Sequence, residues 1–156
     1  SMGAHVSACP NHQVGRTTPF KMRCNVAMPG QFGFELDLNK CTEKELEIAK
    51  QAIKDYKELQ DIFHKGSCYR LKSPFETNLS AIEFISEDEQ TVILCVDCKK
   101  AIPKAPEEFI KLEGIDKESL YSLEGEIYGG DYLMNKGLLF ANNSEHSSYR
   151  FIFKKC

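Results

Sequence analysis

Apolar residues recur every three or four positions between residues 46 and 63, which is the spacing of one face of a helix. These positions are Leu46, Ala49, Ile53, Tyr56, Leu59 and Phe63. A capping box, Thr42-Glu-Lys-Glu45, precedes them and Lys65-Gly66 follows them, so both helix ends carry a recognisable signal. The pattern predicts an amphipathic helix of about five to six turns that ends at Lys65.

Two shorter patterns upstream predict strands. Residues 4–8 form a small, mostly apolar run that stops at Cys9-Pro10. Over residues 32–38 apolar and polar or small residues alternate with a period of two, which is typical of a strand. Thr18-Pro19 lies between them and offers a helix N-cap followed by proline at the first helical position, so a short helix to about Met28 is expected. The first 65 residues therefore read as strand, helix, strand, helix.

Beyond Gly66 the pattern changes to short β-like segments. They span residues 81–86, 91–99, 109–114, 120–125 and 149–154, with turn-rich or proline-containing segments such as 87–90 and 103–106 between them. In the last segment Tyr149, Phe151 and Phe153 alternate with Arg150, Ile152 and Lys154, which predicts a strand with one largely solvated face. This half is expected to form an antiparallel sandwich.

Composition excludes several classes of function. The net charge of −3, with basic residues scattered among acidic ones, gives no basic face for nucleic acid. No apolar run approaches the roughly 20 residues of a membrane helix, so no membrane is expected as a partner. Seven cysteines without a framework spacing indicate reduced thiols and a cytoplasmic location. Cys95 and Cys98 stand an odd number of residues apart in a strand, which places them on opposite faces and argues against a metal or redox pair.

Polar residues gather directly after the first predicted strand. Asn11, His12 and Arg16 are the candidate substrate-binding residues, because side chains at the end of a barrel strand face the site where ligands bind. Side-chain bonds to the loop's own backbone are the alternative role for Asn11 and His12. For Arg16 the alternative is a structural ion pair or a clamp on carbonyl groups. No catalytic residue, metal ligand or cofactor is assigned.

Two further positions have both a chemical and a structural interpretation. Glu35 and Asp37 fall on one face of the second predicted strand, and Asp37 lies nearest its carboxyl end. A polar strand end beside a helix cap explains them more simply than direct catalysis does. His5, inside the first apolar strand, is expected to be a hydrogen-bonded core histidine.

Four segments together resemble the C-terminal end of bacterial α-galactosidases of glycoside hydrolase family 36. They are Met2–Arg16, Phe32–Leu38, Tyr69–Phe75 and the most specific of the four, Tyr128-Gly-Gly-Asp-Tyr-Leu-Met-Asn-Lys-Gly137. Members of that family carry a catalytic (β/α)8 barrel followed by a small C-terminal β-sandwich. The resemblance implies that residues 1–65 are the last two βα units of the barrel and residues 66–156 the antiparallel sandwich domain.

The resemblance also implies chemistry. The family hydrolyses terminal α-linked galactose from oligosaccharides such as raffinose or melibiose with retention of configuration, through a nucleophile and an acid/base carboxylate. Both family aspartates lie in motifs with no counterpart in this sequence, so the chain is expected to be an inactive C-terminal fragment of such an enzyme. Its open strand edges predict a homo-oligomer. The alternatives are a stand-alone carbohydrate-binding or interaction β-sandwich module, and a small hydrolase using Glu35, Asp37 and His12.

Overall fold

The computed structural model describes residues 2–100, 102, 107–141 and 146–156, so the expected turn at 103–106 lies outside the described part. The first half contains β1 (Gly3–Ser7), α1 (Phe20–Ala27), β2 (Gln31–Glu35), the short 3-10 helix η1 (Leu38–Lys40) and α2 (Glu43–Lys65). The second half contains β3 (Ser67–Lys72), β4 (Leu79–Ile85), β5 (Thr91–Cys98), β6 (Glu108–Ile110), β7 (Leu120–Leu123), β8 (Glu126–Gly129), α3 (Gly130–Asn135), β9 (Leu138–Phe140) and β10 (Ser147–Lys155). The strand, helix, strand, helix order of the first half is confirmed.

β1 and β2 form a two-stranded parallel sheet, with α1 as the crossover between them. Ala4 pairs with Phe32 and Val6 with Phe34, and these four side chains pack with the helices. The alternate positions, His5 among them, face away from the helices because successive side chains of a strand point to opposite sides. One face of this small sheet is therefore apolar and the other polar.

The long helix begins where the sequence predicts. Thr42 Oγ1 accepts from the backbone N–H of Glu45, and Glu45 Oε2 accepts from the backbone N–H of Thr42, which completes the capping box. The buried stripe differs from the expected one at two positions. Its buried members are Ala49, Ala52, Leu59 and Phe63, with the half-buried Tyr56 packed against them. Ile53 is exposed, and Leu46 is half-buried and outside this cluster. A small alanine at position 52 lets the helix approach its neighbours closely.

α1 starts one residue later than expected. Pro19 occupies the N-cap position rather than the first helical position, and no side chain caps the helix there. The carbonyl group of Thr18 instead accepts a hydrogen bond from Arg23 Nε, so the side chain that orders this helix start comes from one turn further along the helix.

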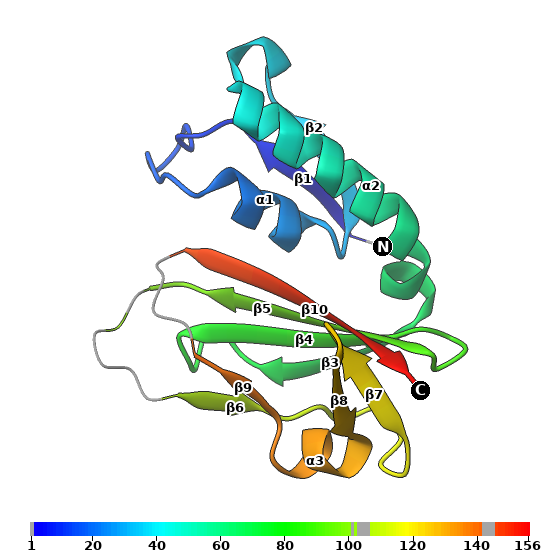
Figure 1. Ribbon diagram of the computed structural model, residues 1–156. Helices are drawn as coiled ribbons and strands as arrows, with labels where there is room; N and C mark the ends of the chain where they lie inside the picture. The colour runs from blue at the N-terminus through cyan, green and yellow to red at the C-terminus, as the bar shows by residue number, and fades with distance from the viewer. Residues whose placement is uncertain (1, 101, 103–106, 142–145) are drawn as a thin grey trace.

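The second half is built on a six-stranded sheet with the order β3-β4-β5-β10-β7-β8, antiparallel throughout. β5 lies between β4 and β10 and has the most continuous run of buried residues. Below this sheet, β6 and β9 pair as a separate two-stranded antiparallel sheet, beside α3 (Figure 1). The antiparallel arrangement expected for this half is confirmed, although its second layer is small.

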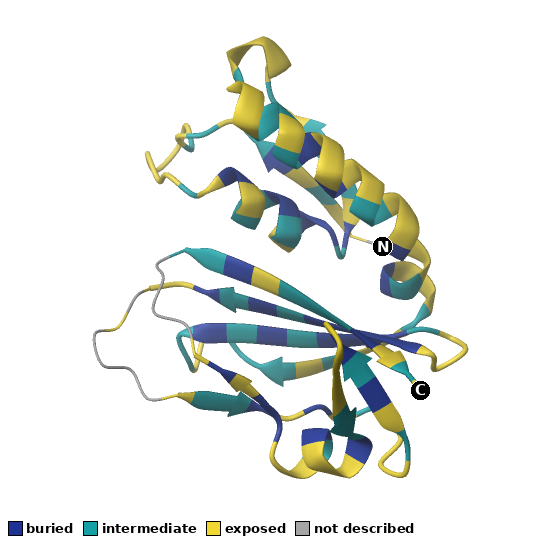
Figure 2. Cartoon of the chain, viewed as in Figure 1, coloured by how far each residue is buried: buried dark blue, intermediate teal, exposed yellow. Residues whose placement is uncertain are grey.

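Two apolar clusters occupy the two faces of the six-stranded sheet (Figure 2). The sheet core joins the sheet to β6, β9 and α3, and includes Leu94, Val96, Ile110, Leu133 and Phe153. The helix core joins the other face to α1, α2, β1 and β2, and includes Val6, Cys24, Phe63, Phe84 and Ile93. Since the rings of Phe63 and Phe84 meet edge to face at 5.0 Å, α2 and β4 are in direct contact.

The prediction of a solvated face on β10 is wrong, because that face lies under α1 and α2. Ile152 packs in the helix core, and Arg150 forms an ion pair with Asp55 of α2 at 2.5 Å. Arg150 also donates to Asn25 Oδ1 of α1 at 3.3 Å. Arg150, whose charge suggested contact with water, instead joins the two halves of the chain.

β3, β8, β9 and α3 were missed from the sequence. β8 follows β7 through a two-residue turn in which Glu124 and Gly125 both have positive φ, 51° and 93°. Glu-Gly is a weak signal for such a turn compared with Asn-Gly. The segment after Tyr128 contains α3, a six-residue helix. No helix in the described part of the chain is long and apolar enough to cross a membrane.

Glu83 of β4 is a fully buried carboxyl group within the sheet core. Its Oε2 accepts from the backbone N–H groups of Glu113 and Gly114, while Oε1 has no partner among the described residues. Burial raises the pKa of Glu83 against the opposing effect of these two hydrogen bonds, because the charged form loses its hydration.

We expect the stability of the chain to depend on pH through Glu83. A folded-state pKa above the unfolded value gives stability that is fully present below the unfolded pKa and is lost as pH rises through the folded pKa. Glu83→Gln has no group that ionises at this position, so the variant does not lose stability in this way. The free energy of unfolding of the variant minus that of the unsubstituted chain should therefore rise with pH, by at most about 1.4 kcal/mol per pH unit. Urea unfolding at pH 4 to 8 measures the difference. A difference that stays constant over this range would show that Glu83 does not titrate there.

Candidate functional site

A cleft of about 540 Å³ opens where the loop after β1 meets α1 and the end of β5. Its lining residues are His5, Ser7, Ala8, Cys9, Asn11, Arg16, Thr18, Met22, Arg23, Val26, Lys99, Lys100 and His146. The loop and the end of β5 lie on the same side of the molecule in Figure 1, although more than 80 residues separate them in sequence. This cleft is the candidate site, because it contains two of the three expected binding residues, Asn11 and Arg16.

Asn11 shapes the loop that forms one wall of the cleft. Its Oδ1 accepts from the backbone N–H groups of Gln13 and Val14 at 3.0 and 3.1 Å. Its backbone N–H donates to the carbonyl group of Arg16, and its own carbonyl accepts from Gly15 N–H. The Asn11 oxygen is therefore occupied by the loop, which is the structural alternative that the sequence left open for this position.

Arg16 and His12 have different surroundings. The Arg16 side chain is exposed on the rim of the cleft and makes no ion pair or hydrogen bond within the described part of the chain. His12 is exposed as well, but it does not line the cleft. The structure thus brings Asn11 and Arg16 together at one cavity and leaves His12 outside it.

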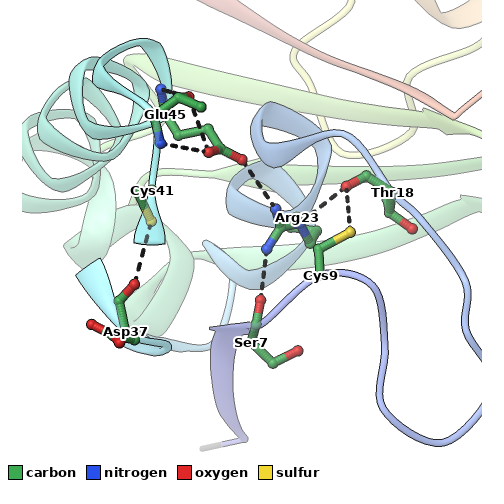
Figure 3. A network of polar contacts seen from close by, with 8 residues as sticks. Ser7, Cys9, Thr18, Arg23, Asp37, Cys41 and Glu45 are labelled. Carbon is green, nitrogen blue, oxygen red and sulfur yellow. Dashed lines mark hydrogen bonds and ion pairs between the residues drawn. The ribbon is translucent and has the colours of Figure 1, made fainter. Parts of the chain in front are cut away.

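The clamp expected of Arg16 is made by Arg23 instead (Figure 3). Arg23 Nη1 donates to the Ser7 carbonyl at 2.6 Å, where β1 ends, and its Nε donates to the Thr18 carbonyl at 3.1 Å. Nη2 lies 3.8 Å from Glu45 Oε1, and the guanidinium group lies over the Phe20 ring. One side chain of α1 thereby joins the strand end, the loop and the first turn of α2.

Sequence reasoning missed Arg23 because it lies within a predicted helix, where a lone arginine is normally solvated. Glu45 could have pointed to it. The capping box fixes the Glu45 carboxylate near the carboxyl ends of β1 and β2, where a cationic partner is expected. Hydrogen bonds from the Thr42 backbone and side chain, with a smaller effect from the Arg23 charge, lower the pKa of Glu45. It therefore remains ionised and available to Arg23.

The two acidic candidates do not form a catalytic pair. β2 ends at Glu35, so Asp37 lies past the strand, where its Oδ1 accepts from Asn39 N–H and caps η1. Glu35 Oε2 lies 2.7 Å from His5 Nε2 across the two strands. The expectation of a core position for His5 is wrong: its side chain is 55% exposed, because position 5 falls on the polar face of the small sheet.

The thiols of Cys24 and Cys95 pack in the helix core and lie outside the lining of the cleft. Burial raises the pKa of Cys24 to about 11 and that of Cys95 to about 12. Cys95 packs on the helix side of the sheet and Cys98 in the sheet core, so the prediction that these two lie on opposite faces is confirmed. All seven cysteines are free.

Comparison with known proteins finds matches along most of the chain. A Melibiase family model matches residues 1–66, and the model of the glycosyl hydrolase family 36 C-terminal domain matches residues 79–153. The curated α-galactosidase AgaA of Geobacillus stearothermophilus is 45% identical over 139 residues, which are 88% of this chain and 19% of the relative. The bifunctional α-galactosidase/sucrose kinase AgaSK of Mediterraneibacter gnavus is 34% identical over 98% of this chain and 17% of its own length.

Solved structures agree with these matches. A variant of Geobacillus AgaA in complex with raffinose superimposes with a TM-score of 0.95 and 41% identity, over 99% of this chain and 22% of that protein. The galactosidase domain of AgaSK superimposes with a TM-score of 0.96 and 33% identity. The chain spans about a fifth of the length of the curated relatives it matches.

We expect Arg23→Met to loosen the wall of the cleft. The substitution leaves the Ser7 and Thr18 carbonyl groups without this donor, so it should lower the free energy of unfolding by about 1 to 3 kcal/mol. Amide hydrogen exchange in residues 8–19 should become faster than in β5. Lys21→Met is the matched control, since Lys21 is exposed on the same helix and lies outside the cleft. Equal effects of the two substitutions would contradict a clamp at Arg23.

Proposed function

Because this chain belongs to glycoside hydrolase family 36, we propose that it forms the C-terminal part of an α-galactosidase that releases terminal α-linked galactose from oligosaccharides. The main support is its superposition, over 99% of its length and with 41% identity, on solved α-galactosidases. Raffinose and stachyose are bound in two of those structures, and these sugars are the proposed substrate class.

Residues 1–65 are proposed to be the end of a (β/α)8 barrel and residues 66–156 a C-terminal β domain. Within this chain β1 pairs only with β2, so each of these strands has one edge with no neighbouring strand among the described residues. A parallel pair with open edges is rare as an isolated unit, since parallel strands are normally buried within larger sheets. The helices cover its apolar face, and its polar face would line the interior of the closed barrel.

A retaining glycosidase needs two carboxyl groups about 5 Å apart on either side of the scissile bond. Glu35 is paired with His5 and Asp37 caps η1, so neither is placed for that role. We therefore assign the nucleophile and the acid/base to parts of the enzyme that this chain does not contain. The proposed contribution of the chain is the wall of the substrate pocket at the carboxyl ends of β1 and β2.

Asn11, His12 and Arg16 are the proposed substrate contacts on that wall. A guanidinium group without an intramolecular partner can donate to sugar hydroxyl oxygens, which suits Arg16. Asn11 would act mainly by holding the loop in shape. His12 lies outside the cleft, so it would contact the substrate only if the bound sugar extends past the rim of the cleft.

Two properties of the whole protein are part of the proposal. Seven free cysteines favour a reducing compartment, and we place the enzyme in the cytoplasm. The open edges of β1 and β2 favour association between copies, because unpaired strand edges are templates for pairing. No cofactor is proposed.

The experiment is hydrolysis of p-nitrophenyl α-D-galactopyranoside by this chain and by a longer protein that adds the upstream sequence of the same gene. We expect turnover only by the longer protein, because the carboxyl pair is outside this chain. In the longer protein Asp37→Asn should leave kcat within about threefold, as a capping role predicts.

Turnover by the short chain, abolished by Asp37→Asn, would contradict the assignment of the catalytic pair. Turnover by neither protein would favour a carbohydrate-binding module. In the active longer protein, Arg16→Ala should raise KM with a smaller effect on kcat, while the control Lys21→Ala should change neither. Equal kinetics for both variants would remove Arg16 from the substrate pocket.

A further inference from the structure

The charge of the cleft is unusual for a site that takes neutral sugars. Four cationic side chains line it, those of Arg16, Arg23, Lys99 and Lys100. No aspartate or glutamate is among the described residues of its lining. The chain as a whole carries a net charge of −3, so this concentration of positive charge does not follow from composition.

Most of this positive charge is not neutralised within the described residues. Arg23 has Glu45 as its counter-charge at 3.8 Å. Lys99 donates to the carbonyl group of Pro74, which carries no charge. The guanidinium group of Arg16 and the ammonium group of Lys100 have no ion pair or hydrogen bond in the described part of the chain. Because Pro74 does not line the cleft, the Lys99 ammonium group is held outside it, and Arg16 and Lys100 are the two cations that remain at the cleft without a partner.

Hydrogen bonds fix the backbone at two of these cationic residues. Lys100 N–H donates to Asn78 Oδ1 at 3.1 Å, and the Lys100 carbonyl accepts from Asn78 Nδ2 at 2.5 Å. The Arg16 carbonyl accepts from Asn11 N–H at 2.9 Å. A fixed backbone lowers the ordering cost of binding, although both side chains are exposed. Met22 and Val26 of α1 add apolar surface to the lining of the cleft.

We propose that this cleft is a binding site for a phosphate group, held by Arg16 of the loop after β1 and by Lys100 after β5. A doubly charged phosphate neutralises more of the positive charge than a carboxylate would, and its oxygens match the planar fork of the arginine guanidinium group. The volume of about 540 Å³ exceeds what one phosphate needs, so the cleft can also hold a small organic group on the phosphate. Arg16 is also a proposed galactoside contact, so the two proposed sites share this residue.

The test is calorimetric titration of the full 156-residue chain with inorganic phosphate, galactose 6-phosphate and galactose. We expect saturable binding of the phosphate ligands with Kd at or below about 1 mM, and none for galactose at the same concentrations. Tighter binding of galactose 6-phosphate than of phosphate would assign the site to a phosphate ester, and equal binding to the phosphate group alone. Raising the salt concentration should weaken both.

Substitutions separate this cleft from general surface charge. Arg16→Ala with Lys100→Ala should weaken phosphate binding at least tenfold. Lys50→Ala with Lys57→Ala removes the same charge from exposed positions of α2 outside the cleft, and should leave Kd within about twofold. Circular dichroism checks that both double variants fold. Absence of saturable binding, or equal weakening in the two double variants, would overturn the proposal.

Discussion

The ion pair between Arg150 of β10 and Asp55 of α2 is the contact on which the arrangement of the two halves depends. The two side chains lie 2.5 Å apart and are only 14% and 24% exposed. Removing one partner from such a pair leaves a poorly hydrated charge behind, and this cost favours a single docking position of the helices on the sheet. Asn25 of α1 adds a second hydrogen bond to the same guanidinium group.

The position of the cleft follows from this docking. With α1 and α2 packed across β4, β5 and β10, the loop after β1 comes to lie beside the residues that follow β5. Arg23 then ties the end of β1 to the loop and to the start of α2. The end of β1 and the cationic residues after β5 thus share one cavity although they come from opposite halves of the sequence.

Local patterns predicted the elements whose own residues specify them. The capping box and the apolar spacing located α2 almost to the residue, and period-two alternation located β2 and β10. α3, β8 and β9 were missed because short elements carry too few residues for a period. β3 was missed although it has six residues, because its residues are largely exposed or half-buried and show no clear apolar alternation. The packing of α1 and α2 over Arg150 could not be predicted, because a polar residue in a strand gives the same sequence pattern whether it faces water or a helix. Arg16 lines the cleft, and its role in binding substrate stays a prediction. The carbonyl clamp that was the alternative role for Arg16 is made by Arg23.

The most direct test of this account is a double-mutant cycle on Asp55→Ala and Arg150→Ala, measured by urea unfolding, with Asp61→Ala and Lys65→Ala as the exposed control pair. The account predicts a loss of about 2 to 3 kcal/mol for Asp55→Ala and a coupling energy above about 1 kcal/mol with Arg150→Ala. The control pair should show about 0.5 kcal/mol or less. Equal coupling in the two pairs would contradict the claim that Arg150 and Asp55 fix the helices on the sheet.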